Sequence, residues 1–290
     1  EGWGFESSLS HIDSIIMKQK INLFLISFFI IKYSFSQVIL EEYNLPTLIN
    51  ETSGLEFYND NLITHNDSGG EPFLYYLTTD GKILSKRKIE DVKNNDWEDI
   101  TIDDKYIYIA DMGNNYDTRN NLSIIKIYLD NNINTSEQIK FNYPQQKSFK
   151  YRKLSMFDAE GLISIDDYLL IFTKNRAKKI TEIYRIPKEP GNYKAKLIGQ
   201  INTESIVTSA DYDMKTKLLV LTSTSDFNDY YIILIENFDY SKLDNLNLKK
   251  FKIPIDKTQV EAIKIIDKNN FLITSEAEIF GSPMMYKISL

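Results

Sequence analysis

The chain has 290 residues, with 34 lysine and arginine residues against 41 aspartate and glutamate residues and a formal net charge of −7. This acidic balance argues against a nucleic-acid-binding protein, which needs a basic face, and against a polybasic patch that would hold the protein on anionic lipid. The sequence has no cysteine and two histidines, His11 and His65. Disulfides, thiolate chemistry and metal sites built on several imidazoles are therefore excluded.

The beginning of the chain carries a targeting pattern. Two lysines, Lys18 and Lys20, follow the first plausible start at Met17. An almost entirely apolar run of 11 residues comes next at Ile21–Ile31, and then a segment with small residues at Ser34–Gln37. This order predicts a secretory signal peptide over residues 17–36. A membrane anchor is the alternative, but the apolar run is too short for a bilayer core, which takes roughly 20 residues.

The rest of the chain is expected to form one domain. No linker or low-complexity segment divides residues 37–290, and residues 1–16 lie upstream of the expected start, outside the fold. Removal of the signal peptide would leave a secreted or periplasmic protein, without stable membrane insertion. We expect it to be a monomer.

One unit recurs five times along the domain. Each copy has a short apolar strand, a turn and a second strand, and β-branched and aromatic runs broken by Asn, Asp and Gly are typical of strands. The intervals between the copies are 45, 62, 49 and 52 residues. The copies begin at Ser53, Glu98, Glu160, Ser209 and Glu261.

Further strands complete the copies. A third strand is expected at 73–77, 122–129, 181–186, 230–235 and 285–288. A fourth strand is expected at 83–89, 138–143, 195–201 and 248–253. The fifth copy has no fourth strand, and one strand at Val38–Tyr43 is left without a copy.

Four-stranded units at near-equal spacing predict an all-β fold, a five-bladed β-propeller with blades around a central channel. Val38–Tyr43 then supplies the outer strand of the last blade, so that the ring closes without two exposed sheet edges. A six-bladed ring would need a hidden unit, for which only the interval of 62 residues has room. A β-sandwich would not explain five near-equal copies.

The first strand of a propeller blade lines the channel, so the residues that begin the copies are expected to face one another. Three carboxylates and two hydroxyls would meet there, and crowded carboxylates repel unless a cation lies between them. Ca²⁺, which takes six to eight oxygen ligands in irregular geometry, suits such a set better than Mg²⁺ or zinc. The alternative is that these side chains only satisfy backbone groups at the strand entrances.

At this point the chain resembles the calcium-activated nucleotidases, the soluble apyrases, in spacing and pattern over residues 38–290. The likeness lies in the order Ser, Glu, Glu, Ser, Glu, in Thr-Ser-Gly-Leu, Asp-Trp-Glu-Asp, Asp-Ala-Glu-Gly, Thr-Ser-Ala-Asp and Gln-Val-Glu-Ala. Members of that family are five-bladed propellers with one Ca²⁺ in the channel and one ligand from each blade. The resemblance implies Ca²⁺ ligands at Ser53, Glu98, Glu160, Ser209 and Glu261.

A closer likeness is to uncharacterised secreted bacterial propellers that carry segments similar to His65–Gly69, Asp96–Ile100 and Ala110–Asn115. This likeness implies a fold and no settled activity. The chain departs from the nucleotidases at Asn66–Gly70, where they have Asp-Asp-Arg-Thr-Gly, and at Asn114–Tyr116, where they have Lys-Glu-Trp. An arginine and a base-stacking tryptophan of that family are therefore missing.

Loops that leave the second strands are expected to gather at one mouth of the channel. Their acids, amides and basic groups suit a small polar or anionic ligand. The candidates for a general base are Asp67 and Asp111. The candidates for substrate binding are Asn66, Asn114, Arg119, Lys174 and Arg176.

Each of these residues also has a structural interpretation. Asp67–Gly70 suits an Asx turn, and the basic residues can be solvated surface groups. His65 is expected to be a packed strand residue rather than a base. Trp97 is either a substrate platform or a buried brace for the channel strand.

Two functions therefore stay open. The first is a secreted Ca²⁺-dependent hydrolase of phosphoanhydrides or phosphate esters. The second is a propeller without catalysis, in which Ca²⁺ stabilises the ring and the rim binds a glycan, a peptide or a partner protein.

Overall fold

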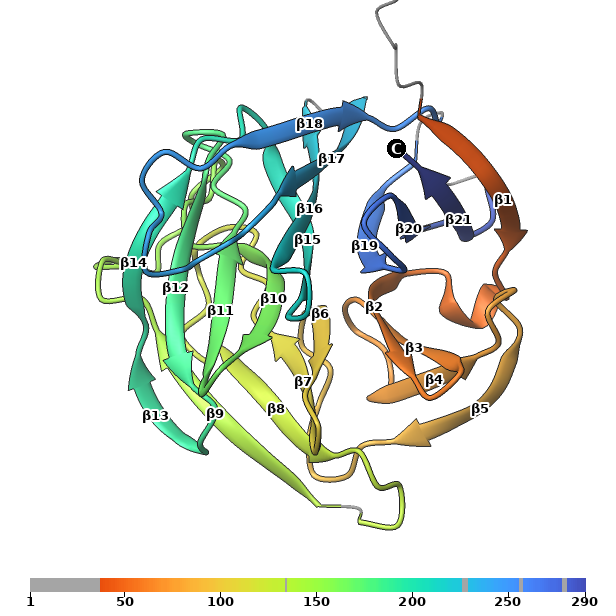
Figure 1. Ribbon diagram of the computed structural model, residues 1–290. Helices are drawn as coiled ribbons and strands as arrows, with labels where there is room; N and C mark the ends of the chain where they lie inside the picture. The colour runs from red at the N-terminus through yellow and green to blue at the C-terminus, as the bar shows by residue number, and fades with distance from the viewer. Residues whose placement is uncertain (1–36, 134, 226–228, 256–257, 278–280) are drawn as a thin grey trace, which may run out of the picture. The chain divides into compact units, whose positions relative to one another are not determined.

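Five sheets surround a central axis in the structure, a computed structural model of the chain (Figure 1). The structure describes residues 37–133, 135–225, 229–255, 258–277 and 281–290. The signal peptide predicted at 17–36 and the upstream segment 1–16 lie outside these residues. The fold is the predicted five-bladed β-propeller, and the six-bladed alternative is wrong because the described residues form five sheets.

The strands run outward from the channel in chain order within each blade. Blade 1 contains β2 (Thr52–Tyr58), β3 (Asn61–Asn66), β4 (Phe73–Leu77) and β5 (Ile83–Lys88). Blade 2 contains β6 (Trp97–Ile102), β7 (Tyr106–Asp111), β8 (Ser123–Tyr128) and β9 (Ser136–Asn142). Blade 3 contains β10 (Ala159–Ile165), β11 (Tyr168–Thr173), β12 (Thr181–Pro187) and β14 (Lys196–Ile201). Blade 4 contains β15 (Ile206–Asp213), β16 (Leu218–Ser225), β17 (Asp229–Ile235) and β18 (Leu248–Lys252).

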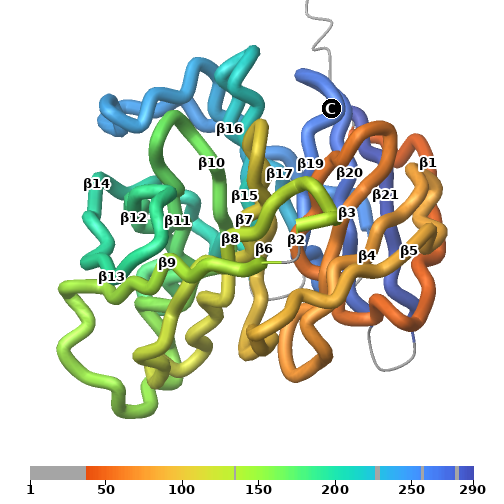
Figure 2. Tube along the Cα trace, turned by 90° about the horizontal axis from the view of Figure 1, so that it is seen from below, coloured from red at the N-terminus to blue at the C-terminus, as the bar shows by residue number. Residues whose placement is uncertain are grey.

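Blade 5 is built from both ends of the described chain. It contains β19 (Val260–Ile265), β20 (Asn270–Ser275), β21 (Met284–Ser289) and β1 (Val38–Asn44), and a short 3-10 helix, η1 (Thr47–Ile49), follows β1. β1 pairs antiparallel with β21, from Val38 opposite Ser289 to Asn44 opposite Met284. Figures 1 and 2 both show the two strands side by side. The predicted ring closure is confirmed.

Hydrophobic clusters fill the spaces between blades. There is one cluster between each pair of neighbouring blades in the described part of the chain. The two inner strands of every blade are almost wholly buried, whereas outer strands such as β5 and β18 alternate between exposed and half-buried residues. The apolar runs of the inner strands are explained by this burial on both faces. No helix of the described residues is long and apolar enough to cross a membrane.

Blade 2 has a fifth strand that the sequence pattern does not predict. β13 (Gly191–Lys194) lies in the connection between β12 and β14 of blade 3, and it pairs in parallel with β9, the outer strand of blade 2. Figure 1 shows β13 beside β9 at the outer edge of that blade. No turn joins β13 to β9, because β9 belongs to blade 2 and β13 to a connection of blade 3, so turn signals in the sequence do not predict their pairing. The fourth strand predicted at 195–201 corresponds to β14 of blade 3.

Each innermost strand carries a β-bulge near its start. In four blades one residue is left out of the pairing with the second strand, and in blade 2 the shift lies between Trp97 and Ile100. A bulge redirects the local side chains and is common beside functional sites. The residues left out in blades 1, 3, 4 and 5 are Gly54, Glu160, Thr208 and Glu261.

The bulges correct one expectation about the repeat. Glu98, Glu160 and Glu261 lie at the bulges of their strands, but Ser53 comes one residue before the bulge of blade 1 and Ser209 one residue after that of blade 4. The predicted equivalence of the five residues therefore holds for the glutamates and is wrong for the serines. Sequence spacing could not detect the shift because it amounts to a single residue.

Asp99 joins three blades at the channel. Its Oδ2 atom accepts hydrogen bonds from the backbone amides of Leu162 (2.9 Å) and Ala210 (3.3 Å), and its Oδ1 atom accepts one from Ile100 (2.9 Å). The side chain is buried. Blades 2, 3 and 4 are thus linked by one carboxylate, which satisfies backbone donors that would otherwise be buried without partners.

We expect Asp99→Asn to destabilise the ring. The amide group of asparagine would place a donor against a backbone donor, and an unsatisfied buried donor costs about 1–3 kcal/mol. Chemical denaturation should show this loss, while Asp104→Asn in the neighbouring exposed turn should leave the free energy of unfolding unchanged. Equal stability of the two variants would contradict the role assigned to Asp99.

Candidate metal centre

Five carboxylates from three neighbouring blades meet at one mouth of the channel. They form two groups, each with one oxygen per residue and all three oxygens within 4.8 Å of one another. Glu98 belongs to both groups, which contain Asp67, Asp96 and Glu98, and Glu98, Asp158 and Glu160. Asp67 follows β3, whereas the other four residues enter or begin β6 and β10.

The local sequence explains this convergence. Asp96 directly precedes β6 and Glu98 is its second residue, and Asp158 and Glu160 have the same positions at β10. Side chains two residues apart on a strand point to the same side. Gly113 completes the arrangement, because a Cβ atom at this position would collide with Glu98 Oε1 and Asp96 Oδ2.

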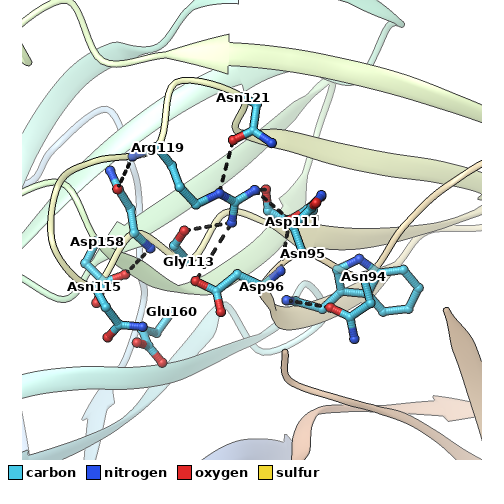
Figure 3. A network of polar contacts seen from close by, with 12 residues as sticks. Asn94, Asn95, Asp96, Asp111, Gly113, Asn115, Arg119, Asn121, Asp158 and Glu160 are labelled. Carbon is cyan, nitrogen blue, oxygen red and sulfur yellow. Dashed lines mark hydrogen bonds and ion pairs between the residues drawn. The ribbon is translucent and has the colours of Figure 1, made fainter. Parts of the chain in front are cut away.

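Basic side chains balance only part of this charge. Lys174 Nζ lies 2.7 Å from Glu160 Oε1 and 4.0 Å from Glu261 Oε1, and Arg176 forms an ion pair with Asp158. Figure 3 shows Arg119 on the other side, directed toward Asp96 and Asp111. Its Nη1 atom is 3.9 Å from Asp96 Oδ2, so Asp96 has only a distant cationic partner.

The negative charge that the basic side chains leave unbalanced contributes, with burial, to raised pKa values of carboxyl groups in the cluster. Burial, together with Asp96 and Glu160, raises the pKa of Asp67 to about 9. Burial and the carboxylate of Asp158 raise the pKa of Asp96 to about 6. For Glu98, burial and the charge of Glu160 raise the pKa well above its usual value. A bound divalent cation would reverse these shifts by favouring the charged carboxylates.

The five residues at the starts of the copies have different surroundings. Glu98 and Glu160 are in the carboxylate groups, and Glu261 lies beside them, across Lys174. Glu261 is 8% exposed and its Oε2 atom has no hydrogen-bond partner in the described part of the protein. By contrast, the Ser53 hydroxyl donates to the Glu98 carbonyl (2.6 Å), and the Ser209 hydroxyl lies 3.4 Å from Asp99 Oδ1.

The two candidate general bases differ in availability. Asp111 is buried in an ion pair with Arg119 (2.8 Å) and accepts a hydrogen bond from Asn95 (2.6 Å), outside both carboxylate groups. Asp67 belongs to the first group, and its Oδ1 atom has no hydrogen-bond partner among the described residues. The structure therefore favours Asp67 over Asp111 for chemistry at the cluster.

The candidate substrate-binding residues are engaged in internal contacts. Arg119 bonds the Gly113 carbonyl (2.7 Å) as well as Asp111, and Asn114 donates from its side chain to the Phe157 carbonyl (3.2 Å). Asn66 donates to the Leu48 carbonyl (3.0 Å). Arg176 contacts Asn115 besides Asp158, and Lys174 is buried against Glu160. These contacts orient the loops around the carboxylates.

His65 and Trp97 form a buried pair behind the cluster. Both side chains are fully buried, and their rings pack edge to face with centroids 5.5 Å apart. Burial lowers the pKa of His65 to about 4, so the imidazole is neutral at physiological pH. The structural interpretation of both residues is confirmed, and Trp97 is not a substrate platform.

Asp96 and Asp158 are members of the cluster that the sequence prediction missed. The signal was present: Asp-x-Glu occurs at the starts of two successive copies, as Asp96-Trp97-Glu98 and Asp158-Ala159-Glu160. The prediction assumed one ligand from each blade and therefore did not include the aspartate of either motif. The structure supplies two carboxylates from each of blades 2 and 3 instead.

Comparison with known proteins reveals a fold and no family. No family model matches the sequence, and no curated protein sequence matches it. The PQQ-bound aldose sugar dehydrogenase of Streptomyces coelicolor has a similar structure, with a TM-score of 0.51 and 10% identity over 88% of this chain and 98% of that chain. At this identity the likeness shows the propeller fold alone.

Two other solved structures are less similar. A mitotic checkpoint complex structure gives a TM-score of 0.46 and 11% identity over 90% of this chain and 94% of that chain. A quinonprotein alcohol dehydrogenase-like protein from Bacteroides thetaiotaomicron gives a TM-score of 0.38 and 12% identity over 82% and 48% of the two chains.

The raised pKa values predict how pH affects the metal-free protein. Because the folded state holds protons more tightly than the unfolded chain at Asp67 and Asp96, these two groups make stability fall as pH rises between about 4 and 9. His65, whose pKa is lowered from 6.5 to about 4, acts in the opposite direction below pH 6.5, so the fall is expected to stand alone above about pH 7. One pKa unit corresponds to about 1.4 kcal/mol, so Asp96 alone contributes on the order of 1–3 kcal/mol.

Melting temperatures measured in EDTA from pH 7 to pH 9 should show this fall. The same series in Ca²⁺ should be flatter, because a bound cation stabilises the deprotonated cluster. A metal-free protein whose melting temperature rises over this range would contradict the prediction.

Proposed function

We propose that the protein is a Ca²⁺-binding β-propeller, with the ion held by Asp67, Asp96, Glu98, Asp158 and Glu160. The single observation that carries this proposal is the pair of carboxylate groups that share Glu98. All ligands are oxygen atoms, which is the donor set that Ca²⁺ takes at 2.3–2.6 Å. The two groups contain no nitrogen or sulfur ligand that would favour zinc.

Two further observations support the fit of a cation. Glu261 has a carboxylate oxygen without a hydrogen-bond partner, although the side chain is buried next to the cluster. Gly113 leaves free the position next to Glu98 and Asp96 that any larger residue would fill. Burying several carboxylates without a cation is unfavourable, and binding one would offset that cost.

In its catalytic form, the proposal is a Ca²⁺-dependent hydrolase of phosphoanhydrides or phosphate esters. A bound divalent cation supplies polarisation of a phosphoryl oxygen. Asp67, with an unpaired carboxylate oxygen, is the candidate to accept a proton from an attacking water. Arg176, whose side chain is 16% exposed, is the candidate to contact the phosphate at the rim.

The alternative is a propeller in which the cation only stabilises the ring. One observation favours it: Arg119, Lys174 and Arg176 each form an ion pair with a carboxylate of the protein. A phosphate would have to displace these partners. In this form the rim would bind a glycan, a peptide or a partner protein.

Phosphate release separates the two forms. The protein is incubated with nucleoside triphosphates, nucleoside diphosphates and p-nitrophenyl phosphate, in Ca²⁺ and in EGTA. Release that requires Ca²⁺ and is lost in Glu98→Gln supports the hydrolase. Ca²⁺ binding without release of phosphate from any of these substrates supports the stabilising role alone.

We also propose that the protein is exported after removal of residues 17–36. The proposal rests on the charged, apolar and small-residue order of that segment. N-terminal sequencing of exported material should find a start near Gln37. Material that retains Ile21–Ile31 would refute it.

A further inference from the structure

A cavity of about 920 Å³ lies over one face of the blade 2 sheet. Strands β8, β9 and β13 form its base, and residues 91–93 and 95 of the β5–β6 connection border it. Its volume is in the range of small-molecule sites, which is about 300–1,000 Å³. The cavity depends on β13, because this strand widens the sheet beyond β9.

The strand register shows which side chains reach the cavity. Lys140 on β9 pairs with Asn192 on β13, and Asn142 pairs with Lys194. These residues alternate with Phe141 and Tyr193, which pack in the hydrophobic cluster toward blade 3 and also contribute to the lining of the cavity. Because alternate residues of a strand face opposite sides, the polar residues line the cavity together.

The cavity is rich in polar groups without internal partners. Six amide side chains and three lysines line it. In the described residues no ion pair or side-chain hydrogen bond involves Lys93, Lys140, Lys194, Gln138 or Asn192.

The cavity also has a local excess of positive charge in an acidic protein. Its three lysines face two carboxylates, and one of these, Asp111, is paired with Arg119. Ile125 and Leu122, both buried, provide an apolar area at its base. Lysines bind carboxylates, amides exchange hydrogen bonds with hydroxyls, and an apolar base suits the C–H face of a sugar ring.

We propose that this cavity binds an acidic oligosaccharide, one that carries carboxylates on sugar rings. Amide side chains outnumber lysines two to one, which fits a ligand with more hydroxyls than charges. The cavity lies over the face of the sheet, where side chains rather than backbone groups meet the ligand. An acidic peptide, which would pair along a strand edge, is therefore less well matched.

The cavity is separate from the carboxylate cluster. Figure 3 shows Arg119 between Asn121, Asp111 and Asn95 on one side and Asp96 on the other. Asn121, Asp111 and Asn95 line the cavity, whereas Asp96 belongs to the cluster. The inference therefore does not depend on the proposed Ca²⁺ site, and saccharide binding should persist when divalent cations are removed.

The test is calorimetric titration of the full chain with trigalacturonate in EDTA. We expect saturable binding that weakens as salt rises, and weaker binding of neutral maltotriose. Lys140→Gln and Lys194→Gln should each weaken binding by about fivefold, and together by on the order of 20-fold. Lys196→Gln removes the same charge from the exposed β14 strand, outside the cavity, and should leave the affinity unchanged.

Four outcomes would overturn the proposal. The first is no binding of trigalacturonate in EDTA, and the second is equal affinity for maltotriose, which would leave the lysines without a role. The third is equal affinity for inorganic sulfate, which would indicate a simple anion site. The fourth is tighter binding of hexaglutamate, which would indicate a peptide site. A double variant that melts like the wild type shows that lost affinity is not lost folding.

Discussion

Ca²⁺ should raise the melting temperature of the protein, and Glu98→Gln should remove most of this gain. A ligand that binds only the folded state at about 100 times its dissociation constant stabilises by roughly 2.7 kcal/mol. For a domain of this size that corresponds to roughly 5–11 °C. Glu98 is the residue shared by both carboxylate groups, so its replacement should weaken Ca²⁺ binding by about 10- to 100-fold.

The metal-free comparison sharpens this prediction. Glu98→Gln keeps the shape of the side chain and removes a carboxyl group whose pKa is already raised by burial. In EDTA the variant should therefore be at least as stable as the wild type, and only the Ca²⁺-dependent gain should shrink. Glu137→Gln replaces an exposed carboxylate near the start of β9, outside both carboxylate groups; it is the matched control and should keep the full gain. Calorimetry that finds no Ca²⁺ binding to the wild type would refute the site.

A second pair of variants tests which residues are ligands. Asp96→Asn should weaken Ca²⁺ binding, because Asp96 belongs to the first carboxylate group. Ser209→Ala should have little effect, because its hydroxyl is directed to Asp99. The opposite result would favour one ligand from each blade, as the repeat pattern alone predicts.

Removal of β1 should have the largest effect on folding. A chain that begins at Leu45 loses six aligned residue pairs with β21 and exposes the edge of the last blade. Each hydrogen bond contributes about 0.5–1.5 kcal/mol, and total stability is only about 5–15 kcal/mol, so the loss is a large share of the total. We expect a much lower melting temperature and a tendency to associate through the exposed edge.

The control is a chain that begins at Gln37, which keeps β1. A synthetic peptide of residues 37–44 added to the shortened chain should restore part of the melting temperature, because it can pair with β21. Size-exclusion chromatography and thermal melting measure both effects. If the shortened chain melts like the control and stays monomeric, β1 does not close the ring.

The sequence was sufficient for the blades and their closure because both depend on local signals. Alternating apolar runs and Asn/Asp turns define the strands, and Val38–Tyr43 was the one strand left without a place. β13 was missed because its partner lies in another blade and no turn connects them. Local patterns do not encode such long-range pairing.

The candidate site was predicted only in part, for a similar reason. The repeat identified Glu98 and Glu160, and the rim loops identified Asp67. The two serines, however, lie one residue away from the bulges of their strands, whereas the glutamates lie at the bulges. Asp111 forms an ion pair with Arg119 and lies outside the cluster. Which carboxylate is paired and which is free depends on loop geometry, and spacing along the chain does not determine it.

The composite last blade also determines the order in which the protein can complete its fold. β1 precedes all other strands of the propeller in the chain, whereas its partner β21 follows them, so β1 is synthesised well before β21. Until β21 emerges, β1 has no partner in its own blade, and the growing propeller is an open arc with two unpaired ends. Contacts between the ends of a chain form slowly, because a long loop must close first. We therefore expect the closing of this arc to be a late step of folding, and the edges of β1 and β20 to stay open to other chains until then.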